Sequence, residues 1–252
     1  MRSLLHSPRF NESPNSKLSF NKEQRKQRVF MALVFGLFTL AGHAATITWT
    51  NGNSTGVWSD PLNWDSSSVP GTSDDVVFDV GSSANCNIDG NYAIRSLTIA
   101  SDYLGVVSLG SNTLEVSSGL SIAVASGFDA GTGLIKLVGG QTINSAASLF
   151  NMEIGMGSGN LNLSDTVYVD NELTITSVNL MYSSSGNGHQ IQVKGDVVIN
   201  DAWGPSGSYY AVVSLVGDTD QSISGSGNAS YLDISKTAGD VLLDDDLTLA
   251  NG

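Results

Sequence analysis

The sequence predicts an all-β fold of the solenoid type, and two features of its 252 residues support this prediction. Short apolar–polar–apolar triplets recur along it, each with two side chains on one face and one on the other, as in a half-buried strand. Four three-residue segments return later in the chain at one constant offset, which indicates an internal repeat built from stacked units. The matches are Gln141-Thr142-Ile143 with Gln221-Ser222-Ile223, Met152-Glu153-Ile154 with Leu232-Asp233-Ile234, Leu161-Asn162-Leu163 with Val241-Leu242-Leu243, and Val167-Tyr168-Val169 with Leu247-Thr248-Leu249.

Three triplets, which start at Leu161, Val167 and Leu173, begin six residues apart and have Ser, Asp and Asn between them. These turn formers predict a separate short strand at each triplet. Such strands suit a prism whose faces are parallel sheets, and right-handed connections are the default for parallel strands. The predicted fold is therefore a right-handed parallel β-helix. A left-handed β-helix, whose six-residue cadence lapses across residues 124–160, and a β-sandwich are the alternatives.

Residues 1–44 are expected to be a signal peptide. A basic segment at residues 25–28 precedes an apolar run at residues 29–40, and small residues follow up to Ala44. The apolar run is too short to span a bilayer comfortably, so we expect no membrane insertion after the signal is removed. The sequence thus predicts a secreted or outer cell-surface protein whose mature chain begins at Ala45, which N-terminal sequencing would test.

Charge and cysteine content narrow the functions of the mature chain. Seven of the eleven cationic residues lie in residues 1–44, so the remainder has four against 22 acidic residues and a formal net charge of −18. Such a surface repels nucleic acid and attracts divalent cations. Cys86 is the only cysteine, which excludes an intramolecular disulfide and favours a small buried hydrophobe.

Residues 45–85 are predicted to form a Trp-rich N-terminal cap, and residues 86–252 the repeat region, with three copies of which the last is incomplete. A cap shields the first turn of a solenoid from water. The alternative for the tryptophans is a sugar-stacking surface made by Trp58, Trp64 and, in a later loop, Trp203. The final strands at residues 241–249 have no polar cap, so end-to-end self-association of the fragment is expected.

Candidate chemistry is sparse. His189 follows Gly186-Asn187-Gly188, as in a loop of polygalacturonases, but it has no neighbouring acid–base partner in the sequence, and we expect a surface histidine. Asp74, Asp75 and Asp79 are a candidate calcium site, since calcium prefers carboxylate and carbonyl oxygens; solvated acidic turns are the simpler interpretation. We expect no other cofactor.

One motif carries a family resemblance. The spacing W-x8-W-x5-W-x5-P, from Trp49 to Pro70, followed by Asp74-Asp75, resembles the start of large secreted bacterial surface proteins with autotransporter-like, β-helical bodies. The resemblance covers residues 46–252. It implies a right-handed parallel β-helix exported from a Gram-negative-type cell, acting as an adhesin or scaffold in a longer protein.

Two classes of function follow from these features. The favoured one is a non-catalytic extracellular scaffold or adhesin segment, with host or matrix glycans or surface proteins as partners. The alternative is a carbohydrate-binding or carbohydrate-active β-helix protein of the polysaccharide lyase or hydrolase type. An exposed aromatic row beside an acidic cleft would favour the alternative.

Overall fold

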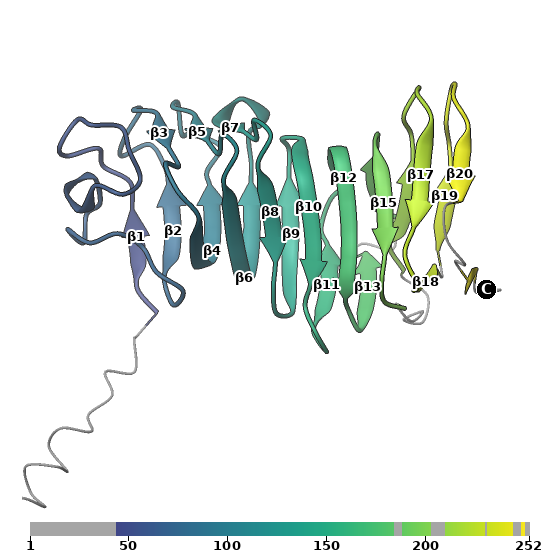
Figure 1. The fold of residues 1–252 in the computed structure, drawn as a ribbon. Helices are drawn as coiled ribbons and strands as arrows, with labels where there is room; N and C mark the ends of the chain where they lie inside the picture. The colour runs from purple at the N-terminus through teal and green to yellow at the C-terminus, as the bar shows by residue number, and fades with distance from the viewer. Residues whose placement is uncertain (1–43, 184–187, 203–209, 230, 244–247, 250–252) are drawn as a thin grey trace, which may run out of the picture. The chain divides into compact units, whose positions relative to one another are not determined.

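The chain folds as a parallel β-solenoid of about seven turns (Figure 1). The computed structural model describes residues 44–183, 188–202, 210–229, 231–243 and 248–249, with the side chains of the last two left out. The named strands pair in parallel wherever they are described, so the β-sandwich alternative is wrong and the predicted β-helix class is confirmed. Ala44, at the predicted cleavage site, is the first described residue. Trp203 and residues 244–247 fall outside the described residues.

The strands stack in three ladders, in which successive turns of the chain pair side by side. Ladder A contains β1 (Thr46–Thr48), β2 (Asp75–Phe78), the second halves of β4 (Tyr92–Ile99) and β6 (Thr113–Ile122), β9 (Gln141–Ser145), β11 (Asn160–Leu163) and β13 (Leu180–Ser183). Ladder B contains the first halves of β4 and β6, β8 (Leu134–Leu137), the second parts of β10 (Leu149–Gly155) and β12 (Val167–Ser177), β15 (Asp196–Ile199), β17 (Gln221–Ser224) and β20 (Val241–Leu243).

Ladder C contains the first parts of β10 and β12 and then β14 (Gln190–Val193), β16 (Val212–Leu215) and β19 (Leu232–Ile234). Two smaller groups complete the strand pairing: β3 (Cys86–Asn87) with β5 (Val107–Ser108) and β7 (Phe128–Asp129), and β18 (Asn228–Ala229) with β21 (Thr248–Leu249). Helical structure in the described residues is limited to two 3₁₀ turns, η1 (Pro61–Asn63) and η2 (Ala125–Gly127).

The apolar positions of the triplets form one continuous core inside the turns. In ladder A, Leu97 pairs with Leu120, Leu120 with Ile143 and Ile143 with Leu163, and all four are buried. Side chains alternate across a strand, so the polar middle residue of each triplet points outward. Each such buried side chain contributes roughly 1.5–3 kcal/mol, and the stacked layers supply the stability that a disulfide-free chain needs.

Some triplets that begin six residues apart are not separate strands. Residues 114–116 and 120–122 lie within β6, and residues 167–169 and 173–175 lie within β12. The prediction of a turn between them is therefore wrong. The backbone stays extended around the corner of the solenoid because both halves keep neighbours on adjacent turns, and the β4–β6 register shifts at the corner between Ile94 and Ser96. Such an irregularity bends the strand without ending it.

The long internal repeat is structural, but it does not stack on itself. Gln141 pairs with Leu161 in ladder A, and the corresponding Gln221 pairs with Val241 in ladder B. The same local pairing is therefore repeated on a different ladder, which shows that the repeat offset is not a whole number of turns. The prediction of stacked repeat copies is wrong in this respect: the unit that stacks is the single turn.

The turn length also varies along the chain. Leu134 pairs with Asn151, whereas Val197 pairs with Ile223, and the residue numbers show that the second turn is much longer than the first. A strict six-residue cadence would keep this interval constant, so the hexapeptide pattern considered for a left-handed helix does not describe these turns. Loops of different length at the corners absorb the variation.

Lys236 stabilises the longer of two equivalent loops. Two loops lead into the matched glutamines: residues 138–140 before Gln141 and the longer residues 216–220 before Gln221. The Nζ of Lys236 donates hydrogen bonds to the carbonyl oxygens of Gly217 (3.2 Å) and Thr219 (2.7 Å) and to Oε1 of Gln221 (2.6 Å). In the earlier repeat copy, which has the shorter loop, the equivalent position is the buried Met156. The longer loop therefore has extra carbonyls, and the lysine satisfies them.

Lys236→Met, which inserts the residue of the equivalent position, is expected to lower the free energy of unfolding by about 1–3 kcal/mol. The substitution removes the donor for three acceptors, of which the Gln221 side chain is buried. Urea unfolding followed by circular dichroism measures the change. Lys194→Met is the control, because the 2.7 Å pair of Lys194 with Asp170 is largely exposed and contributes little. Equal effects of the two substitutions would contradict the assigned role of Lys236.

The Trp-rich segment is part of the same core as the solenoid. Trp49, Trp58 and Trp64 have exposed fractions of 0%, 0% and 2%, and they pack against Phe78 of β2. The Trp49–Trp64 and Trp58–Trp64 ring pairs are edge-to-face, with centroids 5.0 and 4.7 Å apart. Since β1 and β2 already belong to ladder A, the solenoid begins at Thr46 and not after residue 85.

Polar groups fix the turns between the tryptophans. Asp60 is the N-cap of η1 and accepts hydrogen bonds from the Leu62 amide and from the side chains of Asn53 and Thr55. The hydrogen bonds from Asn53 and Thr55 hold the pKa of the Asp60 carboxyl below its usual value. The buried Asn63 donates to Thr55 Oγ1 at 2.7 Å. These bonds satisfy several polar groups of the loop while the indole rings are buried; the buried Nε1 of Trp58 has no hydrogen-bond partner.

In the last described turn, apolar side chains that are in register with buried core residues are exposed to solvent. Leu243 pairs with Ile223 and Ile234 pairs with Leu215; the partners are fully buried, but Leu243 and Ile234 are 59% and 57% exposed.

Among the described residues, no helix has the length and apolar character needed to cross a membrane.

Candidate functional site

The tryptophans do not form an exposed platform. Trp58 and Trp64 are buried against each other, and Trp64 Nε1 donates to the Trp58 carbonyl at 2.9 Å. A ring in this position presents no face to a pyranose, so the surface considered for these two residues is not formed. Trp203 lies outside the described residues.

The three candidate calcium ligands are engaged separately. Asp75 binds the side chains of Arg95 and Ser96 on the next turn. Asp74 accepts a hydrogen bond from the Gly71 amide at 2.9 Å, and Asp79 accepts one from the Gly81 amide at 2.8 Å. Over the described part of the chain, no three carboxylate, histidine or cysteine side chains gather in a way that could hold a metal ion.

The surroundings of His189 and Cys86 bear on acid–base and nucleophilic chemistry. His189 Nδ1 lies 3.9 Å from Asp165 Oδ1, beyond a hydrogen bond. Cys86 is fully buried, and burial raises the pKa of its thiol, with a smaller contribution from the charge of Asp89. The thiol therefore stays protonated at neutral pH, and Cys86 acts as the small buried hydrophobe expected from the sequence.

An uncharged polar row runs along the outer side of ladder A. Ser96 pairs with Gly119, Gly119 with Thr142 and Thr142 with Asn162, on four successive turns. These residues alternate with buried leucine and isoleucine, so the row faces outward. Adjacent strands lie about 4.8 Å apart, so the residues of the row follow one another at that interval, and its polar side chains are interrupted at Gly119.

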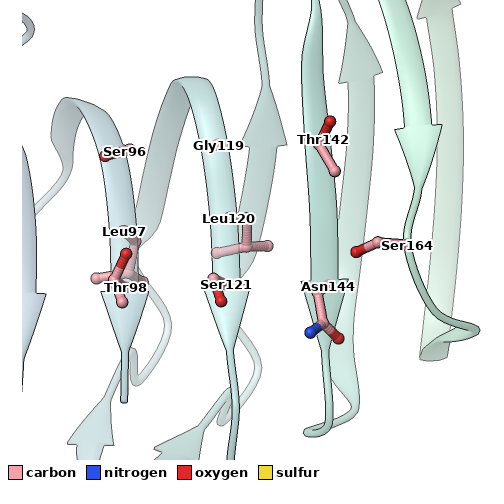
Figure 2. A pocket seen from close by; sticks show the side chains of 9 residues that line it. All are labelled: Ser96, Leu97, Thr98, Gly119, Leu120, Ser121, Thr142, Asn144 and Ser164. Atoms are coloured by element: carbon pink, nitrogen blue, oxygen red, sulfur yellow. The ribbon is translucent and has the colours of Figure 1, made fainter. Parts of the chain in front are cut away.

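A second row lies beside the first. Thr98 pairs with Ser121, and Ser121 with Asn144. Side chains of both rows line a shallow depression of about 250 Å³ on the outer face of ladder A (Figure 2). Figure 2 shows the side chains of Ser96, Thr98, Ser121, Thr142 and Asn144 along consecutive strands of this face.

Tyrosines extend the first row towards the C-terminal turns. Tyr182 on β13 is in register with Asn162 and forms an isolated bridge with Tyr210. The ring of Tyr210 stacks on that of Tyr231, with centroids 3.8 Å apart and an interplanar angle of 12°. Tyr210 is 39% exposed. We call the following six residues the neutral strip: Ser96, Gly119, Thr142, Asn162, Tyr182 and Tyr210.

The outer side of ladder B differs in charge. Glu115, Lys136 and Glu153 are in register there, and Lys136 Nζ lies 3.2 Å from Glu153 Oε1. Glu153 and Glu172 line a depression of about 320 Å³ on this side. Ladder B therefore presents a charged surface in the region where ladder A presents a neutral one.

The neutral strip has the chemistry of a binding surface. Hydroxyl and amide groups donate and accept hydrogen bonds without a charge that must be desolvated. Tyrosine adds a rigid apolar face with a polar edge, and Tyr, Ser, Gly and Asn are the residues that adaptable binding sites favour. These groups can form hydrogen bonds and ring contacts with a ligand.

Comparison with protein families, with curated proteins and with solved structures finds no match to this chain. The neutral strip is thus described from its own geometry.

Reasoning from the sequence missed the strip because it concentrated on tryptophan and acidic residues. One signal was present: the middle residues of the ladder A triplets are all uncharged, Thr142 and Asn162 in the strip and Thr98 and Ser121 in the row beside it. The three tyrosines gave no comparable signal, because Tyr182, Tyr210 and Tyr231 lie far apart in sequence and meet through the stacking of turns.

Proposed function

We propose that residues 45–252 form a non-catalytic scaffold segment of a secreted or cell-surface protein, of the adhesin kind. The observation that carries this proposal is that several charged side chains form ion pairs or hydrogen bonds between adjacent turns of the solenoid, as a structural role requires. Such contacts are Asp75 with Arg95, Lys136 with Glu153, Lys194 with Asp170, Asp196 with the Ser222 amide, Asp201 with the Val178 amide, and Asp220 with the Asp240 amide.

A scaffold of this kind needs stiffness and a surface for its partners. About seven turns at a spacing of ~4.8 Å give a stiff segment roughly 30 Å long. The signal-like residues 1–44 support export, and the net charge of −18 in the remaining chain favours partners other than nucleic acid. The N-terminal tryptophan motif supports the bacterial surface-protein class.

Turnover measurements on glycans test the proposal. The full chain, incubated with pectin, alginate and soluble glucans, is expected to release no new reducing ends and no unsaturated products. Heat-denatured protein sets the background. His189 is the residue to substitute, because its Nδ1 lies 3.9 Å from a carboxylate oxygen of Asp165. Turnover that His189→Ala abolishes would establish an enzyme and overturn the scaffold proposal.

A further inference from the structure

The neutral strip is continuous along the solenoid. Its first four residues occupy successive turns of ladder A, and its aromatic part follows directly, because Tyr182 is in register with Asn162. A ligand that contacts the whole strip must itself be extended and must lie along the solenoid axis. The strip therefore favours a linear polymer over a compact small molecule.

The charge of the strip selects the kind of polymer. Its six residues are uncharged, and the charged pair at its N-terminal end, Asp75 with Arg95, is internally neutralised. The chain around it is strongly acidic. A polyanion would be repelled by that field, and a polycation would be drawn instead to the acidic side chains of ladder B. A neutral polymer rich in hydroxyl groups matches the strip.

The depression gives such a polymer a place to lie. Gly119 lies between Ser96 and Thr142, and the space above it is open: an added Cβ would meet Ser96 Cβ at 3.8 Å and the Thr142 carbonyl oxygen at 3.9 Å, which are ordinary contacts. Glycine here keeps the floor of the depression low without any need for a positive φ angle. A Cβ at Gly119 therefore fits without displacing its neighbours, and a longer side chain would extend from it into the depression.

We infer that the neutral strip binds a neutral glycan that runs along the solenoid axis. Ser96 Oγ already donates to Asp75 and Asn162 Nδ2 to Thr142 Oγ1, so glycan hydroxyl groups use the remaining lone pairs and N–H of these three side chains. The apolar C–H face of a sugar ring stacks on the face of Tyr210 that Tyr231 leaves open. Polar side chains on turns about 4.8 Å apart, interrupted at Gly119, suit a ligand that carries hydroxyl groups along its length. This inference names the partner of the proposed scaffold and rests on that non-catalytic role.

Isothermal titration calorimetry of the full chain with three neutral oligosaccharides tests the inference: cellohexaose, laminarihexaose and maltohexaose. At least one is expected to bind, and polygalacturonate is expected not to bind. Gly119→Gln, which fills the depression, and Tyr210→Ala, which removes the stacking face, are each expected to weaken binding at least about tenfold. Tyr168→Ala is the matched control, because Tyr168 is 40% exposed but lies on ladder C. The Tyr168→Ala protein should bind the oligosaccharide with the same affinity as the unaltered chain.

Three outcomes would overturn the inference: no binding of any of the three oligosaccharides, binding that Gly119→Gln and Tyr210→Ala leave unchanged, or binding of polygalacturonate in preference to them. Far-UV circular dichroism of each variant checks that the fold is kept. Binding is measured without any turnover, so failure here leaves the scaffold proposal standing, whereas glycan cleavage would end the scaffold proposal and leave the strip as a substrate site.

Discussion

Trp64→Ala is expected to lower the free energy of unfolding by about 3–5 kcal/mol. The ring of Trp64 is 2% exposed and contacts Trp49, Trp58 and Phe78 edge-to-face. Alanine leaves a cavity where three aromatic rings met, and it removes the indole N–H that bonds the Trp58 carbonyl. Since these rings cover the first turn, the loss should also open β1 and β2 to solvent.

Urea unfolding measures the free energy, and hydrogen exchange locates the opening at residues 46–48 and 75–78. Leu62→Ala is the control, because Leu62 lies in the same segment but is 56% exposed, and its substitution should change the free energy by less than about 0.5 kcal/mol. A Trp64→Ala protein as stable as the Leu62→Ala protein would show that the aromatic cluster is not what holds the N-terminal turn.

Leu173→Ala is expected to cost about 2–5 kcal/mol. Leu173 is fully buried in ladder B, between Met152 and Val197 on the adjacent turns. In a solenoid each turn contacts only its neighbours, so a cavity in the middle weakens two interfaces at once. We therefore expect the turns on the two sides of Leu173 to unfold in separate steps, which hydrogen exchange would resolve as two groups of protection factors.

Leu243→Ala is the matched comparison, since Leu243 occupies the same inward position on ladder B in the last described turn. Leu243 is 59% exposed, so its removal should cost less than about 1 kcal/mol. If both substitutions lower the free energy of unfolding by the same amount, then Leu243 is buried in solution and the expectation for the last turn is wrong. If Leu173→Ala costs less than about 1 kcal/mol, the stacked core does not carry the stability.

Alternation along the strands predicts the buried side chains of most triplets; Ile234 and Leu243 in the last described turn are exceptions. In Val167-Tyr168-Val169 both valines are fully buried and Tyr168 is 40% exposed, as the pattern predicts. Direction alternates from one residue to the next in an extended chain, so this property depends on local sequence alone. The all-β class and the inward or outward side of each triplet position follow from that local rule.

The position of each triplet around the solenoid depends on every preceding loop, so local sequence does not predict it. Gln141 and Gln221 share a sequence pattern and a pairing register but lie on ladders A and B. The same dependence brings Tyr210 beside Tyr182 and leaves Leu243 uncovered while Ile223 is buried. The sequence by itself determined the strands and their inner and outer sides. Only the tertiary structure decided which residues of adjacent turns pair, because the position of each strand around the solenoid depends on the combined length of all the irregular loops before it.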